Sequence, residues 1–247
     1  MSLSVIIITK NEEAHIGACI DSLAFADEII VLDSGSTDAT REIAADKGAR
    51  VSQSADWPGF GRQKNRALDL ATCDWVLSVD ADERVTPELA DAIRKELAAP
   101  SADAYKIARL SRFGDRWIRH SGWWPDHVLR LFRRGTARFK EVPVHESVIP
   151  DGRVAILDGH FLHYPYASLE HFIAKINLYS SEAAGIMHAR GKKTTALGAV
   201  GHAVWTFFRL YVVRRGFLDG KEGFILAAMA AAGSFFRYTK LLYLNKS

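Results

Sequence analysis

The sequence predicts an α/β fold in which a parallel sheet carries helices on both faces, and two observations in the first hundred residues lead to this prediction. Ser4–Thr9 is a continuous apolar run rich in β-branched residues, which is typical of a strand buried on both faces. The residues that follow repeat apolar side chains at helical spacing, with Ile16, Cys19, Ile20 and Leu23 on one face. Such strand–helix–strand units, repeated along a chain, form parallel sheets.

The remaining elements of the first hundred residues continue this alternation. Gly48 is the expected stop of one helix, and Pro87 suits the first turn of another. We expect strands at Glu28–Asp33, Arg50–Gln53 and Trp75–Val79, and helices at Asp38–Lys47, around Arg62–Ala71 and from Pro87 to about Ala98. Ligands of such sheets bind at the carboxyl ends of the strands, where polar residues gather in this sequence.

The pattern changes after residue 100. Short β segments separated by Gly, Pro and Asp turns indicate a mixed or antiparallel extension of the sheet, and they are Ala104–Leu110, Val128–Phe132, Val144–Ile149 and Val154–His163. From about Leu169 onward the pattern is helical. The sequence is therefore divided into a main domain at 1–168, with halves 1–100 and 101–168, and a helical extension at 169–247.

Length and composition exclude several classes of protein. With 247 residues, 48% hydrophobic and 25% charged, the chain has the composition of a globular protein and not of a disordered or fibrous one. Its two cysteines, Cys19 and Cys73, exclude a disulfide-stapled scaffold and a multi-cysteine zinc site. The apolar run near the N-terminus, Val5–Ile8, has no basic residues before it, so we interpret it as a strand and not as a signal peptide.

Charge is segregated along the chain, although the formal net charge is only +3. Residues 1–100 carry a net charge of −8, residues 101–140 carry +7, residues 141–189 carry −4, and residues 190–247 carry +8. Two basic blocks in the second half indicate an anionic partner, which the charge alone leaves open between nucleic acid, a membrane surface and a phosphorylated substrate. No recognisable nucleic-acid-binding motif accompanies the charge, so we expect no nucleic-acid partner.

Two uncharged runs, Thr194–Phe208 and Gly223–Phe236, dominate the helical extension. At 15 and 14 residues, both fall short of the roughly 18–20 apolar residues that a helix needs to span a bilayer. Basic residues flank both runs, which favours a peripheral contact of residues 190–247 with an anionic membrane surface. The alternative is burial of these helices against the domain or in a homo-oligomer.

Two carboxylates follow the predicted strand at Trp75–Val79. On an extended backbone, Asp80 and Asp82 project from the same side, and they repel each other unless a cation binds nearby. Hard oxygen ligands favour Mg²⁺ or Mn²⁺, which bind to one or two carboxylates together with water and substrate phosphates. The alternative is an aspartate that only caps the turn into the next helix.

The sequence lacks the glycine-rich loops of common nucleotide-binding folds. The turn after the first strand contains no glycine, and no G-x-x-x-x-G-K-[ST] motif occurs, so neither a dinucleotide cradle nor a P-loop is expected. Side chains must therefore hold any nucleotide. Asp33 is placed to accept hydrogen bonds from a ribose or base, and Lys64 is placed to bring a cation near a diphosphate.

Four segments, taken together and in order, resemble a known family. VIIITKNEE, VLDSGSTDAT, GFGRQKNRAL and WVLSVDADE look like inverting nucleotide-sugar glycosyltransferases of family 2, which have the GT-A fold. The most similar branch is that of the β-glycosyltransferases that build the inner core of lipopolysaccharide. RLFRR, VPVHES and FLHYPY in the second half also resemble that branch, whereas the last eighty residues are similar only in character.

The resemblance implies that residues 1–168 are the catalytic domain, with 1–100 as its nucleotide-sugar-binding half and 101–168 as its acceptor half, and it implies roles for individual residues. The uridine would be held by Thr9, Asn11, Glu12 and Asp33, with Lys64 near the base or diphosphate and Asp80 on the ribose and metal side. Asp82 would ligate Mn²⁺ or Mg²⁺, and His163 is the candidate for the histidine that reaches the metal, the alternative being a core histidine beside Tyr164. Glu146 is the candidate base that takes the acceptor hydroxyl proton, the alternative being a surface carboxylate that pairs with an arginine. The sequence departs from the usual acidic pair there, because His145 replaces the first acid.

The resemblance also implies a reaction and its partners. We expect a metal-dependent enzyme that moves a hexose, with glucose as the expected one, from a UDP-sugar to a heptose of an anionic, lipid-linked saccharide at the cytoplasmic face of the inner membrane. From their place in a loop flanked by glycine and proline, Trp123 and Trp124 are expected to stack on the acceptor sugar, and the alternative is that they pack within the fold. Arg130 is assigned to the acceptor or to the leaving diphosphate. The alternatives are another acceptor, such as a protein or another glycolipid, and a non-catalytic nucleotide-sugar-binding scaffold at the membrane.

Overall fold

The computed structural model describes residues 1–141, 148–166 and 168–245 of the chain. The chain forms two compact units. The first comprises residues 1–109 and 126–163, and the second comprises residues 110–125 and 164–247. Residues 110–125, which the predicted boundaries assign to the acceptor half, thus belong to the second unit.

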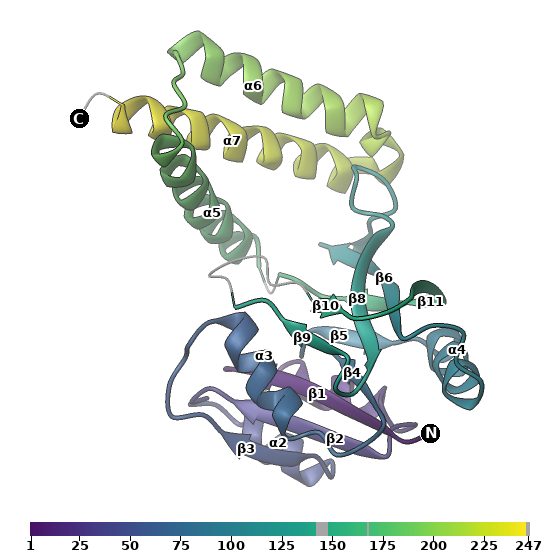
Figure 1. Ribbon diagram of the computed structural model, residues 1–247. Coiled ribbons are helices and arrows are strands. Elements are labelled where there is room, and N and C mark those ends of the chain that lie inside the picture. The colour runs from purple at the N-terminus through teal and green to yellow at the C-terminus, as the bar shows by residue number, and fades with distance from the viewer. Residues whose placement is uncertain (142–147, 167, 246–247) are drawn as a thin grey trace. The chain divides into compact units, whose positions relative to one another are not determined.

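The first unit is built on four parallel strands, as the alternating pattern predicts (Figure 1). These are β1 (Leu3–Thr9), β2 (Glu28–Asp33), β3 (Arg50–Gln53) and β4 (Trp75–Ser78). β1 lies between β2 and β4 and pairs with both in parallel, while β3 pairs with the far side of β2. The central position of β1 explains its continuous apolar run, because both of its faces are covered.

Helices α1 (Ile16–Asp21), α2 (Thr40–Asp46), α3 (Phe60–Asp69) and α4 (Pro87–Ala98) connect these strands and follow them. α4 begins as predicted, because the Thr86 hydroxyl oxygen accepts a hydrogen bond from the backbone N–H of Leu89 at 3.3 Å. α2 begins two residues later than predicted. The Asp38 carboxylate accepts the backbone N–H of Thr40 at 3.1 Å, which places Asp38 before the helix and not within it.

The second half of the first unit extends the sheet with antiparallel strands. Its strands are β5 (Glu83–Val85), β6 (Ala104–Phe113), of which residues 104–109 belong to this unit, β8 (Asp126–Arg133), β9 (Ala137–Phe139), β10 (Val148–Pro150) and β11 (Val154–His163). From β4 the described sheet continues in the order β8, β6, β11 and β5, while β9 and β10 pair with each other. This mixed sheet confirms the predicted fold class. β5 has no counterpart among the predicted strands, and residues 144–147 of the predicted strand Val144–Ile149 lie outside the described residues.

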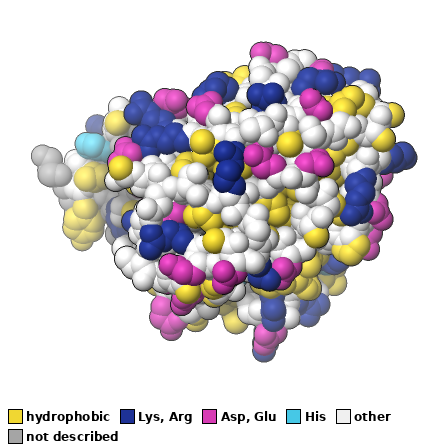
Figure 2. All heavy atoms as spheres, turned by 90° about the horizontal axis from the view of Figure 1, so that it is seen from below, with side chains coloured by type: hydrophobic (Ala, Val, Ile, Leu, Met, Phe, Trp, Pro, Cys, Tyr) yellow, Lys and Arg dark blue, Asp and Glu magenta, His cyan; other side chains and the backbone are white. Residues whose placement is uncertain are grey.

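Two hydrophobic clusters cover the two faces of this sheet. Val5 and Ile7 pack on one side with Leu89 of α4, whereas Ile6 packs on the other side with Leu68 of α3. Because successive side chains of β1 point to opposite faces of the sheet, β1 contributes residues to both clusters. On the face of the molecule shown in Figure 2, basic and acidic side chains are intermixed, with hydrophobic side chains scattered between them.

The second unit is mainly helical. It contains β7 (Arg116–Trp117), α5 (Leu169–Ala189), α6 (Ala196–Phe208) and α7 (Gly220–Leu244), with a π-helical turn at Arg209–Val213 and a 3₁₀ turn at Gly216–Asp219. α6 and α7 lie side by side (Figure 1), and the rings of His202 and Tyr238 stack between them with centroids 3.8 Å apart. α5 joins α7 through Lys240, whose ammonium donates to the backbone carbonyl of Asn177 at 2.8 Å.

The helix that begins at Ala196 is longer than the uncharged sequence run suggests. The helical backbone continues through the charged Arg209 to Val213, which gives 18 residues with a mean hydropathy of 1.3. Among the described residues, this is the segment that is long and apolar enough to cross a membrane by length and composition, and only 6% of it is buried. The prediction that both runs fall short of this length is therefore wrong for the first of them.

Candidate functional site

The loops that follow β1 and β2 are joined by Asn11 and Glu12. Asn11 adopts a φ of 56°, in the left-handed region that asparagine tolerates better than most residues. Its side-chain oxygen accepts the backbone N–H of Thr37 at 2.8 Å, and its own N–H donates to the Ser36 hydroxyl oxygen at 2.9 Å. The N–H of Glu12 donates to the Thr40 hydroxyl oxygen at 2.8 Å. These contacts place the two predicted uridine-binding segments against each other.

Asp33 shapes the second of these loops from a fully buried position. One carboxylate oxygen accepts the backbone N–H groups of Gly35 and Ser36 at 3.0 and 2.9 Å, and the other accepts the Ser36 hydroxyl. The Thr9 hydroxyl also donates to Asp33, at 3.3 Å. The structure thus brings Thr9 and Asp33 together at the ends of β1 and β2, while their role toward a nucleoside stays a prediction.

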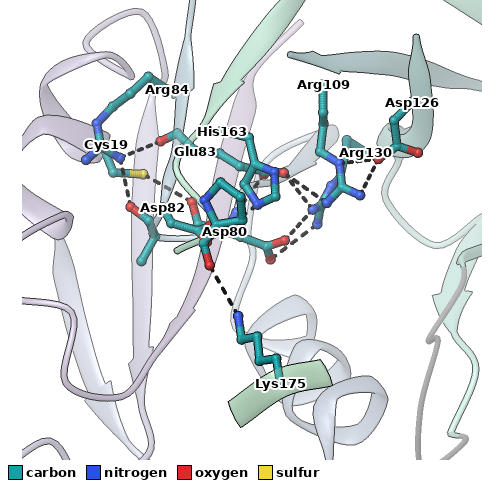
Figure 3. A network of polar contacts seen from close by, with 12 residues as sticks. Cys19, Asp80, Asp82, Glu83, Arg84, Arg109, Asp126, Arg130, His163 and Lys175 are labelled. Carbon is teal, nitrogen blue, oxygen red and sulfur yellow. Dashed lines mark hydrogen bonds and ion pairs between the residues drawn. The ribbon is translucent and has the colours of Figure 1, made fainter. Parts of the chain in front are cut away.

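Charged side chains of alternating sign form a chain beside the carboxyl end of β4. Lys64 of α3 contacts Asp80 at 2.9 Å between the ammonium nitrogen and a carboxylate oxygen. Asp80 in turn pairs with Arg130 of β8, and Arg130 also donates to Glu83 at 2.9 Å. We call this set the charge chain, and its members in order are Lys64, Asp80, Arg130, Glu83, Arg109 and Asp126. Figure 3 shows the members from Asp80 to Asp126.

The far end of the charge chain lies on β6 and β8. A guanidinium nitrogen of Arg109 lies 3.5 Å from the Glu83 carboxylate, and the Arg109 Nε donates to Asp126 at 2.9 Å. Arg109 and Asp126 face each other in the antiparallel register of the two strands, which explains why they meet. The charge chain therefore depends on strand pairing between residues far apart in sequence.

Electrostatics keep Asp80 ionised. Burial by itself would raise the pKa of its carboxyl group, but the charges of Arg130 and Lys64, and the hydrogen bonds they donate, outweigh burial and hold the pKa well below its usual range. Both cations are themselves almost fully buried. Asp80 is therefore an anion between two cations near neutral pH, while its predicted place beside a bound diphosphate and cation stays a prediction.

Glu83 is the central residue that the sequence analysis does not assign. Its side chain is completely buried, and it accepts the backbone N–H of Asp80 at 2.9 Å besides contacting Arg130 and Arg109. Glu83 thus fixes the turn that carries Asp80 and Asp82. The only signal in the sequence is a third acid directly after the Asp80-Ala81-Asp82 triplet, because Arg109 and Asp126 come from distant segments.

Asp82 and His163 lie together, while their predicted role as ligands of one cation stays a prediction. His163 Nε2 is 3.5 Å from an Asp82 carboxylate oxygen, and the two side chains are 14% and 26% exposed. β11 pairs antiparallel with β5 so that His163 lies opposite Glu83, one residue beyond Asp82. Among the described residues, no group of three or more His, Cys, Asp or Glu side chains could hold a metal ion with protein ligands alone. The pair nevertheless fits Mg²⁺ or Mn²⁺, which take their other ligands from water and substrate phosphates.

A cavity of about 640 Å³ adjoins the charge chain within the first unit. Lys64, Asp80, Arg109 and Arg130 are among the residues that line it. The volume lies within the range of about 300–1,000 Å³ that is usual for small-molecule sites. Substrate-sized space and fixed charges therefore occur together at the carboxyl end of β4.

The remaining predicted site residues fall in three places. Arg130 belongs to the charge chain, which places it beside Asp80. Trp123 and Trp124 belong to the second unit, where Trp123 packs edge-on against Phe113 with centroids 6.3 Å apart. The Trp124 ring is covered by the Arg119 guanidinium at 5.7 Å. Glu146 and its neighbour His145 lie outside the described residues. The acceptor and base assignments therefore stay predictions.

Comparisons with known proteins agree with this architecture. The family model described as "Glycosyl transferase family 2" matches residues 4–150. An uncharacterized glycosyltransferase of Rickettsia typhi is 35% identical over 98% of this chain and 87% of its own length. The lipopolysaccharide core biosynthesis glycosyltransferase LpsC of Rhizobium meliloti is 32% identical over 98% of this chain and 92% of its own length.

A solved structure supports the fold independently. Staphylococcus aureus TarS, crystallised in complex with UDP, aligns with 100% of this chain and 91% of its own chain at a TM-score of 0.53 and 20% identity. This likeness confirms the GT-A fold class. The family model covers more than half of the chain, and the relatives are similar over nearly its full length. The chain is therefore an enzyme that belongs to glycosyl transferase family 2.

Proposed function

We propose that this enzyme transfers a hexose, with glucose as the expected one, from a UDP-sugar to a heptose of the lipopolysaccharide inner core. The observation that carries the acceptor class is the likeness to LpsC, a lipopolysaccharide core biosynthesis glycosyltransferase, over 98% of this chain and 92% of LpsC. A likeness over nearly both whole chains includes the second unit and is not limited to the donor-binding half that many transferases share.

Asp82 and His163 are proposed to hold the divalent cation, Mn²⁺ or Mg²⁺. A cation bound there would neutralise the charge that develops on the departing diphosphate. Lys64 and Arg130 add fixed positive charge beside Asp80 and support the same leaving group. Because Glu83 holds the turn before the transfer begins, these charges do not have to reorganise during the reaction.

Glu146 is proposed as the general base. In an inverting transfer, a carboxylate removes the proton of the acceptor hydroxyl while the oxygen attacks the anomeric carbon opposite the leaving diphosphate. The motif Val-His-Glu supports this assignment by its resemblance to the family. Replacing Glu146 with Gln should leave UDP-sugar binding unchanged and reduce transfer by at least a hundredfold, since general base catalysis contributes about 10²–10⁴-fold.

The enzyme is further proposed to work at the cytoplasmic face of the inner membrane, with residues 190–247 in peripheral contact with anionic lipid. Apolar side chains of α6 are exposed, among them Leu197 at 85%, Val204 at 63% and Trp205 at 57%. Basic side chains follow in the turns after α6, where Arg209, Arg214 and Arg215 are found. An apolar helix face bordered by cations matches the chemistry of an anionic bilayer surface.

Donor binding and metal dependence are tested together by calorimetric titration with a panel of UDP-sugars, with and without Mn²⁺. We expect binding of one UDP-hexose that requires the cation in the wild type and is lost in Asp82→Asn. Asp91→Asn is the matched control, since Asp91 is an exposed carboxylate on α4 that pairs with Arg94. Equal binding by Asp82→Asn would remove the metal assignment, and no binding of any UDP-sugar by the folded enzyme would overturn the donor.

The acceptor is tested with truncated lipopolysaccharides that end in successive inner-core sugars. Transfer from the donor found by calorimetry to a heptose-terminated core is the expected result. Transfer only to a protein or to another glycolipid would overturn the proposed acceptor while leaving the donor site intact. Release of the free hexose from the donor, without transfer to any of these acceptors, would also overturn the proposed acceptor while leaving the donor site intact.

The membrane contact is tested by flotation with vesicles of phosphatidylethanolamine and phosphatidylglycerol. Trp205→Glu should release the protein from these vesicles, because it places a charge on the exposed face of α6. Ile156→Glu is the matched control, since Ile156 is 62% exposed on β11 in the first unit. Unchanged flotation of Trp205→Glu would move the contact elsewhere. A concentration-dependent dimer that only this variant abolishes would show that a second copy covers α6.

A further inference from the structure

The cavity beside the charge chain is also lined by basic side chains that do not belong to the charge chain. Within the charge chain, Lys64, Arg130 and Arg109 are balanced by Asp80, Glu83 and Asp126. The same cavity is also lined by Lys106 and His127. No ion pair or hydrogen bond joins the side chain of Lys106 or of His127 to another residue in the described part of the chain.

Lys106 and His127 lie on the same side of the sheet. In the antiparallel register of β6 and β8, His127 is opposite Ala108, and Lys106 is opposite Leu129. Residues 106 and 108 are two apart on one strand, so their side chains point to the same face, as do those of their partners. Lys106 and His127 are therefore diagonal neighbours, at the spacing of about 7–8 Å that long side chains bridge. Both residues are exposed to the cavity and to solvent.

Lys106 is separated from the place where the diphosphate is proposed to bind, whereas His127 lies on β8, the strand that pairs with β4. β6 is the second strand beyond β4 in the sheet order β4–β8–β6. Neighbouring strands are about 4.8 Å apart, so Lys106 starts from a backbone about 10 Å away from the strand that leads to Asp80 and Asp82. One cavity is thus lined both by residues of the proposed leaving-group site, Lys64 and Asp80, and by Lys106, two strands beyond β4.

We propose that Lys106 and His127 form a subsite for an anionic group, a phosphate or a carboxylate, on the acceptor saccharide. The assignment to the acceptor rests on the transferase function proposed above. Lys106 supplies an ammonium group, and His127 supplies a ring N–H donor and, when protonated, a second charge. Such a subsite makes the enzyme select an acceptor that carries a negative charge at a fixed distance from the hydroxyl that is glycosylated.

The first test measures anion binding directly. Inorganic phosphate is titrated into the full-length protein at constant ionic strength, and the imidazole signals of its nine histidines are followed by NMR. We expect saturable binding that shifts the signal absent from His127→Gln, and an affinity about tenfold lower in Lys106→Met, as for a lost hydrogen bond to a charged group. Lys95→Met, which removes an exposed lysine of α4, is the matched control and should bind phosphate like the wild type. Equal affinities in all variants would overturn the subsite.

The same titration in saturating UDP and Mn²⁺ decides whether the anion belongs to the acceptor. We expect phosphate to bind with unchanged affinity, because the two sites are distinct. Competition between UDP and phosphate would overturn the acceptor assignment and identify Lys106 and His127 as part of the donor site. This measurement does not depend on transfer, so it stands even if lipopolysaccharide proves not to be the acceptor.

The second test uses transfer to a core acceptor. Lys106→Met should raise the KM for the acceptor about tenfold and leave the KM for the donor and kcat nearly unchanged. The source of the anion is found with two altered acceptors, one dephosphorylated and one with its carboxyl groups reduced. The alteration that removes the recognised group should raise the KM of the wild type for the acceptor. It should not raise the KM of Lys106→Met any further. If neither alteration changes the KM of the wild type for the acceptor, the proposal is overturned. If the wild type and all variants alike fail to transfer the sugar to the core acceptor, the acceptor of the proposed function is wrong.

Discussion

Replacing Glu83 with Gln tests whether the charge chain is a buried unit on which the site depends. The Glu83 side chain has no exposed surface, and it contacts Arg130 at 2.9 Å, Arg109 at 3.5 Å and the Asp80 N–H at 2.9 Å. Glutamine has nearly the same shape, so the substitution removes the negative charge without opening a cavity. It leaves the charge chain with three cations and two anions.

The expected cost follows from these contacts. Breaking a buried ion pair by removing one partner costs about 3–5 kcal/mol. Arg130 keeps Asp80 and Arg109 keeps Asp126 as partners, so we expect the lower limit, about 3 kcal/mol of unfolding free energy. At an m value of about 3 kcal/mol per molar urea, the midpoint of unfolding should fall by about 1 M.

Urea unfolding followed by circular dichroism measures this shift, and Glu141→Gln is the matched control. Glu141 is half exposed and pairs with Arg62 at 2.8 Å, so the same chemical change there should cost less than about 1 kcal/mol. A urea midpoint of unfolding for Glu83→Gln that is no lower than that of Glu141→Gln would refute the reasoning. It would mean that solvent, or a change in protonation of a neighbouring group, compensates for the lost negative charge.

Two further predictions concern backbone packing and acid stability. Gly61→Ala should destabilise the protein by about 1–3 kcal/mol, because a Cβ there would lie 2.0 Å from the backbone carbonyl oxygen of Lys140. Gly185→Ala, within α5 and with no atom within 4 Å of its added Cβ, should be neutral or stabilising in the same thermal melts. The depressed pKa of Asp80 stabilises the fold above the unfolded-state value of about 3.9 and ceases to do so as the pH falls through the lower folded-state value. The stability advantage of the wild type over Asp80→Asn should therefore shrink below about pH 4, and an advantage independent of pH would contradict this.

Local sequence patterns predict the parallel half of the first unit well. β2 and β3 have the predicted bounds, and α4 begins at Pro87 after its Thr86 cap. Continuous apolar runs, helical spacing and capping residues act over a few neighbouring positions, so one sequence contains them in full. The same holds for the Asp80-Ala81-Asp82 triplet, whose place at a strand end follows from the strand itself.

Features that depend on distant strand pairing are not visible in those patterns. β5 is three residues long, and without its partner β11 the segment Glu83–Val85 has no strand signal of its own. For the same reason, Arg109 and Asp126 have the sequence signature of ordinary surface residues until the register of β6 and β8 joins them. Arg130 was assigned by its resemblance to a motif, and only the pairing of β8 with β4 shows that it faces Asp80.

The length of the first apolar helix is hidden in the sequence for a different reason. Counting uncharged residues ends the run before Arg209, although helical backbone geometry does not stop at a charge. A long arginine side chain can lie along an apolar surface with its charge in a polar region, so one arginine does not exclude a continuous apolar helix.

The antiparallel pairing of β5 with β11 bears on how this enzyme can be recombined with its relatives. It puts His163 beside Asp82, and the pairing of β4 with β8 does the same for Arg130 and Asp80, across intervals of 81 and 50 residues. A crossover anywhere between residues 82 and 130 would therefore join a donor half from one parent to electrostatic partners from another. Functional chimaeras with exchanged acceptor specificity should arise only where both parents share these partners, or where the crossover falls after residue 163, which would exchange the C-terminal helices as a block.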